Sequence, residues 1–537
     1  MTRRWTLLLL SILIACTGAA FTRNFQPASA SNPPPGPDRY TFMTVNYTAY
    51  TWGLAQWRDQ VPLCSILVDH EGMPFPGEIY RDCGKTIYDK WIVQKPCMNT
   101  DKRLCTGYYV YFLNSYAAQK EIPAELAPAT AWISLEGCEP VFSTPTNICE
   151  APPTLVISGQ EPLPNERIIR VEGTYDGRPF DCNDAVCKFE IPGTVEEGVT
   201  IDFWVFSSYG DSSTPYTAKL RVQQVDNGDP DKNYWYADVL SSQWQGHAVA
   251  TCSDSWKAFP PVGGPPAWLS TPKLSEELSS DIPYTYLAAN LISQGVVDAS
   301  TCADGGLNPD GTVNQCGLEQ ARPAVTAWQN QFDELILTTA RETAVPARLL
   351  KNLFARESQF WPGVFQGMDD AGLGQLTENG ADTTLFWNSY FYEQFCPFVL
   401  SGEACGNGYI HITEDERGEL RRALVRSVNA TCADCPLGIN LEQAGFSVNV
   451  FAHTLIANCE QTGQVIENYA TATPGDVATF EDLWKFTLVN YNAGGGCLAE
   501  ALTYPLGVDQ PLTWENVSPH LTGACSAAVD YVNDISK

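Results

Sequence analysis

Residues 346–360 have the sequence PARLLKNLFARESQF and predict a helix in the C-terminal part of the chain. Pro346 suits the first turn of a helix, and the leucines and Phe354 recur at the spacing of one apolar face. Glu357 follows Leu353 by four residues and Phe354 by three, so it lies at the edge of that face. Partial desolvation there raises the pKa of a carboxyl group and lets it hold a proton near neutral pH, as a general acid must.

The rest of the chain divides into two regions with different patterns of apolar residues. Between residues 40 and 258, short runs of β-branched and aromatic residues, such as GVTIDFWVF (198–206), alternate with turns rich in Pro, Gly and Asn. Beyond residue 272 the apolar residues follow a helical period. We therefore expect a multidomain protein, with an N-terminal all-β part made of Ig-like sandwich modules and a C-terminal, mainly α domain.

Pro/Gly-rich stretches and a break near CEAPPTL (149–155) suggest where the domains begin and end. The expected segments are a signal peptide or lipoprotein signal (1–30), a linker (31–39), a β-rich, disulfide-containing domain (40–150), an Ig-like β-sandwich domain (151–258), a Pro/Gly linker (259–272) and an α-helical domain (273–537).

The N-terminal sequence MTRRWTLLLLSILIACTGAAF (1–21) has two arginines followed by a short apolar run, as export signals do. Three outcomes stay open. The sequence ASA at 28–30 suits a signal peptidase, whereas LIAC at 13–16 resembles a lipobox that would leave Cys16 lipidated and the protein tethered to a membrane. An uncleaved anchor is the third. Each of them places residues 31–537 outside the cytoplasm.

The cysteines agree with export. The chain has 19 cysteines, and setting Cys16 aside leaves an even number, which predicts disulfides in an oxidising compartment. Four closely spaced pairs are predicted to be bonded, namely Cys182/Cys187, Cys302/Cys316, Cys396/Cys405 and Cys432/Cys435. The lone CxxC at 432–435 lacks a second ligand pair, so we predict no metal site and no cofactor.

Charge excludes one class of function. Thirty-two basic residues against 62 acidic ones give a net charge of -30, which repels nucleic acid phosphates and anionic membrane surfaces. Binding of DNA or RNA is therefore not expected.

Three more segments follow Glu357 in order: GLGQLTENGA (372–381), NYNAGGG (490–496) and AAVDYVNDI (527–535). Together with the ES-x-F sequence at 357–360, this series resembles the transglycosylase domain of lytic transglycosylases and goose-type lysozymes. The resemblance covers about residues 330–537 and implies a lysozyme-like fold for the C-terminal domain.

The resemblance also implies roles for individual residues. Glu357 matches the catalytic acid of the family, and Ser358 follows it as a support for the glutamate or the sugar. Gln375 matches a glutamine that lines the cleft, while Tyr491 and Asn492 match a pair that contacts the glutamate and the substrate.

The sequence departs from the family pattern at three places. Gly374 stands where the family has Met or another larger residue, which suggests looser packing, and Gly495 stands where it has proline. The long segment between Gln375 and Asn490 contains five cysteines and is expected to add a disulfide-pinned lobe beside the cleft.

The implied activity is cleavage of peptidoglycan by a lytic transglycosylase in the bacterial cell envelope. Glu357 would protonate the β-1,4 glycosidic oxygen between N-acetylmuramic acid and N-acetylglucosamine and then act as a base, giving a 1,6-anhydro product. A hydrolytic muramidase is the alternative, with Asp369 or Asp370 as a second carboxylate that positions water.

Other functions stay open on the sequence alone. A cell-surface adhesion protein could use the same fold to bind a glycan without cleaving it, and a chitin-like β-1,4 glycan needs only a different subsite shape. The β modules are expected to bind wall polymer or another surface protein.

Overall fold

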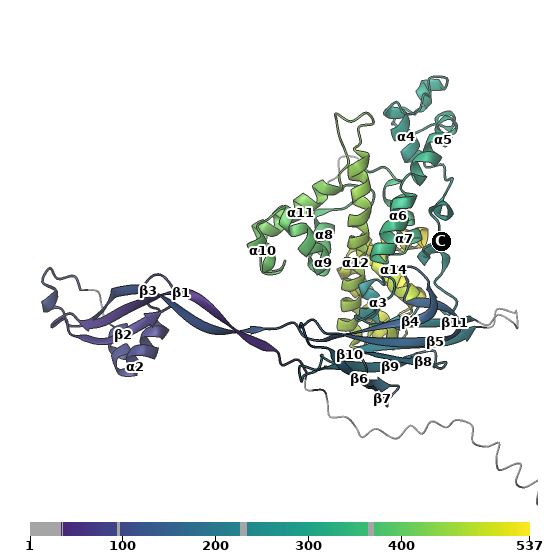
Figure 1. Ribbon diagram of the computed structural model, residues 1–537. Helices are drawn as coiled ribbons and strands as arrows, with labels where there is room; N and C mark the ends of the chain where they lie inside the picture. Colours follow the sequence, from purple (N-terminus) through teal and green to yellow (C-terminus); the bar gives the residue numbers. More distant parts are fainter. Residues whose placement is uncertain (1–33, 35, 94–96, 226–233, 364–369) are drawn as a thin grey trace, which may run out of the picture.

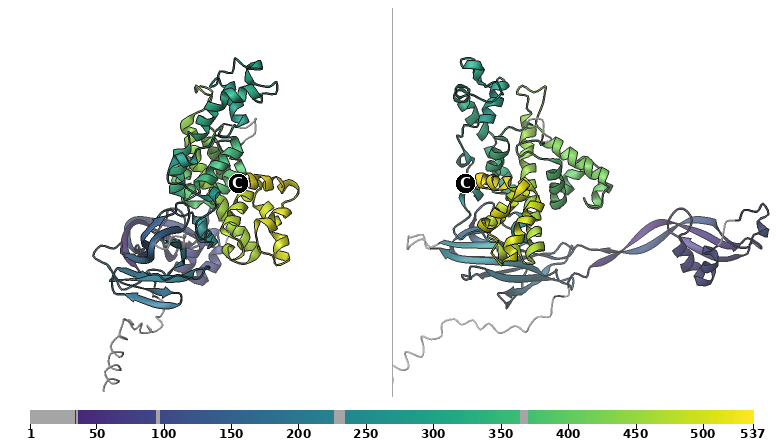
Figure 2. Two further views of the ribbon diagram at one scale, coloured as in Figure 1. Left: turned by 90° about the vertical axis from the view of Figure 1, so that its right-hand side faces the viewer. Right: turned by 180° about the vertical axis from the view of Figure 1, so that it is seen from behind.

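The computed structural model describes residues 34, 36–93, 97–225, 234–363 and 370–537 (Figure 1). Antiparallel β-sheets come first and a helical region follows, so the protein is multidomain, as the sequence predicts at this level. Figures 1 and 2 show the helical region standing over one face of the larger sheet.

The element bounds are as follows. The strands are β1 (Tyr40–Gln56), β2 (Pro62–Val68), β3 (Tyr108–Glu125), β4 (Thr130–Pro140), β5 (Thr146–Gln160), β6 (Ile168–Tyr175), β7 (Arg178–Cys182), β8 (Val186–Glu190), β9 (Val199–Ser207), β10 (Tyr216–Val225) and β11 (Tyr234–Leu240). The helices are α2 (Pro76–Ile92), α3 (Thr251–Trp256), α4 (Thr285–Ser293), α5 (Gln315–Asn330), α6 (Asp333–Thr343), α7 (Ala347–Ser358), α8 (Glu378–Trp387), α9 (Ser389–Phe395), α10 (Gly402–Gly406), α11 (Glu414–Val428), α12 (Leu441–Ala470), α13 (Pro474–Val477), α14 (Phe480–Ala493), α15 (Gly495–Gly507), α16 (Trp514–Val517) and α17 (Ala527–Ile535).

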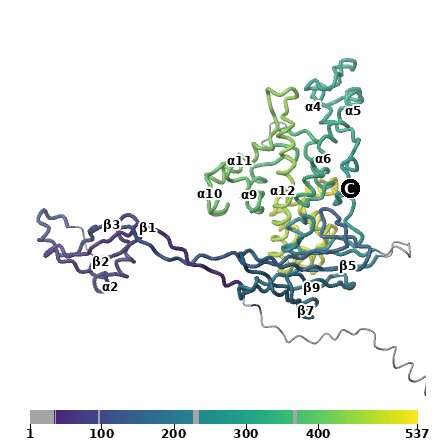
Figure 3. Tube along the Cα trace, in the orientation of Figure 1, coloured from purple at the N-terminus to yellow at the C-terminus, as the bar shows by residue number. Residues whose placement is uncertain are grey.

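The first sheet is a long arm that projects from the rest of the molecule, drawn in purple to blue in Figure 3. Its strand order is β2-β1-β3, and β1 pairs with β3 along its whole length, from Tyr40 to Gln56. Strand β2 joins only from Tyr50 onward, where α2 covers the sheet and a small core of Leu54, Ile66 and Ile79 forms. The arm therefore consists of a two-stranded ribbon with a compact module at its tip.

A buried ion-pair cluster holds the base of the arm. The guanidinium of Arg39 donates to both carboxylate oxygens of Asp211 at 2.7 and 2.8 Å and to both of Glu161 at 2.6 and 2.8 Å. Its remaining N–H donates to the carbonyl of Ala127 at 3.1 Å. All five donors are used, which fixes where the ribbon leaves the larger sheet.

The second sheet has eight strands in the order β4-β5-β11-β10-β9-β6-β7, with β8 paired to β5. The border expected at residue 150 lies inside β5, and the two sheets separate instead between β3 and β4. Pro152 and Pro153 suggested a break between domains, but they lie within β5, between the part that pairs with one neighbouring strand and the part that pairs with another. Residues 146–149 pair with β11 and residues 154–158 pair with β8, so the prolines mark a change of partner.

The helical core extends further toward the N-terminus than expected. Cys252 and Trp256 on α3 belong to it, although residues up to 258 were expected in the β domain. Trp268, within the expected linker 259–272, is also buried in this core. These apolar side chains anchor the connection, so it is packed structure and not a free linker.

The described residues contain nine disulfides, which indicates an extracellular or otherwise oxidising environment. All four predicted pairs are confirmed, including Cys432–Cys435. Across the part of the chain that the structure describes, no helix has both the length and the apolar character that a membrane span requires. Cys16 and the predicted export signal lie outside the described residues.

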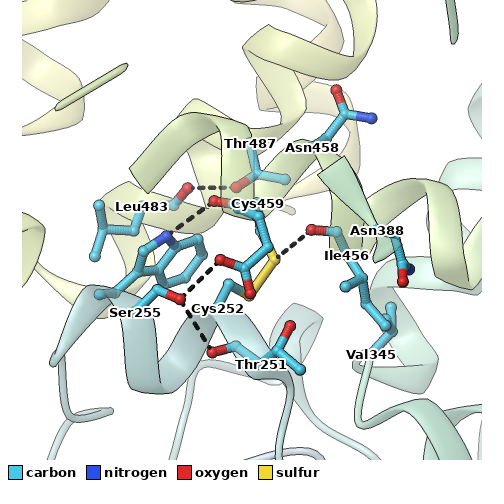
Figure 4. Close-up of a disulfide and its surroundings, with 12 residues drawn as sticks. Thr251, Cys252, Ser255, Val345, Asn388, Ile456, Asn458, Cys459, Leu483 and Thr487 are labelled. Atoms are coloured by element: carbon cyan, nitrogen blue, oxygen red, sulfur yellow. Dashed lines mark hydrogen bonds between the residues drawn. A yellow bond between two sulfur atoms is a disulfide. The ribbon is translucent and has the colours of Figure 1, made fainter. Parts of the chain in front are cut away.

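The bond between Cys252 and Cys459 joins α3 to α12 across a sequence separation of 207 (Figure 4). Both cysteines are fully buried, and the indole N–H of Trp256 donates to the carbonyl of Cys459 at 3.0 Å. The segment that follows the larger sheet is thereby attached to the longest helix.

We predict that Cys252→Ala/Cys459→Ala lowers the free energy of unfolding by about 2–5 kcal/mol, because the bond closes a very long loop. The matched control, Cys432→Ser/Cys435→Ser, removes a disulfide with a sequence separation of only 3 and should cost much less. Calorimetric melting of both variants measures the difference, and equal losses would contradict the prediction.

Candidate active site

Four elements far apart in the sequence meet at Glu357. The residue lies near the end of α7, which stops because Gln359 and Phe360 adopt left-handed conformations (φ 48° and 64°). The segment 371–377, the end of α14 and helix α17 supply the other side chains. The helix predicted over 346–360 is thus present as α7, Ala347–Ser358.

Glu357 has the electrostatic character of a proton donor. Burial raises the pKa of its carboxyl to about 7. The hydroxyl of Tyr531 donates to Oε1 at 2.5 Å and lowers the pKa, as does the charge of Arg356, while the charge of Asp370 raises it. A carboxyl with this pKa exchanges a proton readily in neutral solution.

Tyr531 is the residue of the site that the sequence analysis did not single out, although it expected helix 527–535. The available signal was its position in an apolar stripe with Ala528, Val532 and Ile535, all buried. A buried tyrosine hydroxyl needs a hydrogen-bond partner, so a Tyr on such a stripe indicates a polar group opposite it. Here that group is Glu357.

Helix α17 is attached to α7 by further contacts. The amide of Asn352 donates to the carbonyl of Ile535 at 2.9 Å, and Arg356 lies 3.3 Å from Asp534. The guanidinium of Arg356 also lies over the ring of Tyr531, 5.6 Å from its centroid. These contacts hold the tyrosine hydroxyl at Glu357.

The GLGQ sequence forms a tight turn behind the carboxyl group. Ala371 and Leu376 pair as an isolated bridge, and Gly372 has a φ of 79°, which favours glycine. The hydroxyl of Ser358 donates to the carbonyl of Leu373 at 2.7 Å. Ser358 therefore connects the end of α7 to the turn, and is itself buried.

Gln375 has a φ of 52°, and only the Nε2 end of its side-chain amide is hydrogen-bonded within the described residues. Its Nε2 donates to the carbonyl of Gly372 at 2.6 Å. Its Oε1 is buried and accepts no hydrogen bond within the described parts of the chain. A buried acceptor in this condition is costly. It is suited to a donor from outside the protein, such as a water or sugar hydroxyl.

Tyr491 closes the site from α14. Its hydroxyl donates to the carbonyl of Gly374 at 2.7 Å, and burial and the charge of Glu357 both raise its pKa well above the usual value. Tyr491 thus lies near Glu357, as does Tyr531. Asn492 is exposed, and it is Asn490 that is buried, donating to the carbonyl of Asn458 at 3.1 Å.

The structure gives a physical reason for Gly374. A Cβ at this position would lie 2.5 Å from the ring of Phe451 and 2.8 Å from the hydroxyl of Tyr491. The aromatic ring on α12 occupies the space that a larger side chain would take. The packing behind Gln375 is therefore close, contrary to the looseness that the sequence suggested.

The two candidate second carboxylates differ. Asp370 is near enough to Glu357 for its charge to raise the pKa of Glu357. Asp369 lies outside the described residues. Among the described residues, no group of three or more His, Cys, Asp or Glu is arranged to hold a metal ion.

Comparison with known proteins adds no assignment: no family model, no curated protein and no solved structure matches this chain. The chemistry of the site has to be inferred from its own residues. They provide a carboxyl with a pKa near 7, the buried Tyr531 and the half-buried Tyr491. They also provide the amide oxygen of Gln375, which accepts no hydrogen bond from any residue that the structure describes.

We predict that Gly374→Ala lowers the free energy of unfolding by about 1–3 kcal/mol, because the new methyl group displaces Phe451 or Tyr491. Gly496→Ala is the matched control, since a Cβ there meets nothing within 4 Å. The control should be neutral or slightly stabilising. Urea unfolding of both proteins checks this, and a neutral Gly374→Ala would show that the turn can move.

A second prediction concerns pH. Because the folded-state pKa of Glu357 is about 7, against an ordinary value of 4.5, the folded protein keeps a proton that the unfolded chain has lost. This carboxyl therefore reduces stability progressively as pH rises from 4.5 to 7. Glu357→Gln should raise the free energy of unfolding by up to about 3 kcal/mol above pH 7, with the gain disappearing below pH 4.5.

The control for this measurement is Glu378→Gln, at an exposed residue in the first turn of α8. Its effect on stability should be small and should not grow between pH 4.5 and pH 7. A pH-independent effect of Glu357→Gln would contradict the raised pKa.

Proposed function

We propose that this protein is an exported enzyme that cleaves peptidoglycan as a lytic transglycosylase, with Glu357 as both acid and base. The observation that carries the proposal is the carboxyl group with a pKa of about 7, bonded to Tyr531 and placed beside Tyr491 and the turn that holds Gln375. We assign a lysozyme-like fold to the helical region and Ig-like character to the larger sheet as part of this proposal.

In the first step Glu357 donates its proton to the glycosidic oxygen that joins N-acetylmuramic acid to N-acetylglucosamine. The C1–O bond breaks, the N-acetylglucosamine chain leaves with a free 4-hydroxyl, and positive charge develops at the muramyl anomeric carbon. The newly formed carboxylate on Glu357 stabilises that charge. The raised pKas of Tyr491 and Tyr531 keep both neutral, so each contributes a hydrogen bond without charge.

In the second step the Glu357 carboxylate takes the proton of the muramyl C6 hydroxyl as its oxygen bonds to C1. The product is a 1,6-anhydro sugar, and Glu357 is again protonated. No water is consumed and no second carboxylate is required. A mechanism with a single acid–base group suits this site, where Glu357 is the carboxyl whose pKa is raised to about 7.

A hydrolytic muramidase is the second candidate, and the proximity of Asp370 favours it. In an inverting hydrolase a second carboxylate activates a water on the far side of the sugar, roughly 6.5–9.5 Å from the acid. The products then have reducing muramyl ends.

Three remaining expectations belong to the proposal. The protein acts in the bacterial cell envelope, with an N-terminus that is either removed after export or retained as a tether through Cys16. Its partner is the peptidoglycan glycan strand, and the β modules position the helical region on wall polymer or a surface protein. A chitin-like glycan is a test substrate for the same chemistry.

The test compares the parent protein, Glu357→Gln and the exposed control Glu378→Gln on purified peptidoglycan, with released fragments identified by mass spectrometry. Anhydro-muropeptides from the parent and the control, but not from Glu357→Gln, are the expected result. We expect a loss of at least about a hundredfold, since the group serves as both acid and base.

Other outcomes separate the alternatives. Reducing muramyl ends would replace the transglycosylase with a hydrolase and make Asp370→Asn the next variant. Release from chitin alone would change the substrate. If none of the three proteins releases fragments but all of them still sediment with the wall, the enzyme proposal is overturned in favour of a glycan-binding surface protein.

A further inference from the structure

The arm differs from the rest of the chain in charge. Residues 40–125 contain eight basic and nine acidic side chains, whereas residues 126–537 contain 20 basic and 52 acidic ones. The arm is thus almost neutral, while the remainder carries nearly the whole negative charge. At physiological ionic strength charges repel strongly only within about 8–10 Å, so the arm is the region where a second molecule meets little repulsion.

The ribbon between the body and the tip has no third strand. Residues 40–49 of β1 pair only with residues 116–125 of β3, since β2 joins beyond them. Figures 1 and 2 show this stretch alone between the two ends of the arm. Isolated two-stranded ribbons are marginal in water, and each edge presents unpaired backbone groups.

The two edges of the ribbon are not alike. On the β3 edge, Glu121, Pro123 and Glu125 provide the charges and the proline that commonly protect an edge from pairing. The ammonium of Lys120 instead lies over the ring of Tyr47 on β1 and donates to Asp69 at 2.5 Å. On the β1 edge, residues 40–49 (YTFMTVNYTA) contain no charge and no proline. That edge is β-branched and aromatic, a composition that favours strand addition.

Large apolar side chains on the β1 segment are also exposed. The exposed fractions are 53% for Tyr40, 61% for Phe42 and 50% for Met43. These residues precede the small core at the tip and are not covered by it. A partner strand along β1 would pair the backbone and cover side chains on both faces of the ribbon.

We propose that two copies of this protein pair through the β1 edges of their arms, antiparallel and about a two-fold axis near Thr44 and Val45. The two ribbons then form one four-stranded sheet in which the protected β3 edges face outward. Such an interface is self-complementary, with no charged residue of either β1 segment opposed to the other.

The distribution of charge allows a second copy to bind at the β1 edge in this antiparallel arrangement. Antiparallel pairing places the acidic bodies at opposite ends of the paired ribbons. Ten residues of strand span about 34 Å, well beyond the screening length. Each body then lies next to the nearly neutral tip of the other copy. The proposal does not depend on the enzymatic activity.

The buried Arg39 cluster makes the arrangement geometrically defined. Because all five donors of Arg39 are bonded where the ribbon leaves the larger sheet, the ribbon has a fixed starting point relative to Glu161 and Asp211. The start of each ribbon is thereby fixed relative to the larger sheet of its own copy.

The test uses a matched pair of substitutions. Asn46 and Gln119 face each other across the ribbon and share one hydrogen bond of 2.8 Å, and both are exposed. Asn46→Lys and Gln119→Lys each remove that hydrogen bond and add one positive charge at the same position along the ribbon. The first places the charge on β1 and the second places it on β3. Sedimentation equilibrium of the exported chain and both variants gives the dimer dissociation constant.

We expect a dimer for the parent and for Gln119→Lys, and at least about tenfold weaker association for Asn46→Lys, because a lysine on the edge opposes pairing. Hydrogen exchange of the amides in residues 40–49 should slow as the parent dimerises. A monomeric parent at all concentrations would overturn the proposal. So would equal effects of the two variants, or a dimer in which the amides of residues 40–49 gain no protection.

Discussion

The burial of the middle of α12, residues 450–459, on almost every side is the constraint on which the rest of the helical region depends. Its residues Phe451, Asn458 and Cys459 each meet a different segment: the turn at Gly374, the side chain of Asn490 and the disulfide to α3. A helical segment that is mainly apolar on all sides is stable only when other elements enclose it. Enclosing α12 therefore brings together the turn, α14 and the connection from the larger sheet.

The electrostatics of Glu357 reflect a competition within this packing. Burial disfavours the charged carboxylate, and the hydroxyl of Tyr531 and the charge of Arg356 partly offset that effect. The outcome is a pKa of about 7, with neither form strongly favoured in neutral solution. A group that both gives and takes a proton in one catalytic cycle requires this balance, which is why the transglycosylase proposal and the pH dependence of stability rest on the same side chain.

Some features of the structure could be predicted from local sequence. The helix at α7, the division into sheets and helices, and four disulfides between near neighbours follow from periodicity and spacing. The candidate carboxyl could be placed at the edge of an apolar stripe. Long-range relations could not be predicted: the disulfide between Cys252 and Cys459, and Tyr531 as the partner of Glu357, depend on tertiary packing.

Two errors have specific physical causes. The prolines of β5 suggested a break because proline cannot donate to a ladder, but the strand changes its partner there and continues. Gly374 suggested loose packing because a small residue stood where a larger one was expected. The missing volume is supplied by Phe451, which is 77 positions later in the sequence and gives no local signal.

The hydrogen bond between Glu357 and Tyr531 spans 174 residues, and this spacing has a consequence for how the molecule matures. A chain synthesised from its N-terminus delivers α7 long before α17. During that interval the arm and the larger sheet can already fold, whereas the carboxyl of Glu357 lacks the hydroxyl that orients it. The contact between Glu357 and Tyr531 thus forms late, after the arm and the larger sheet can already be in place.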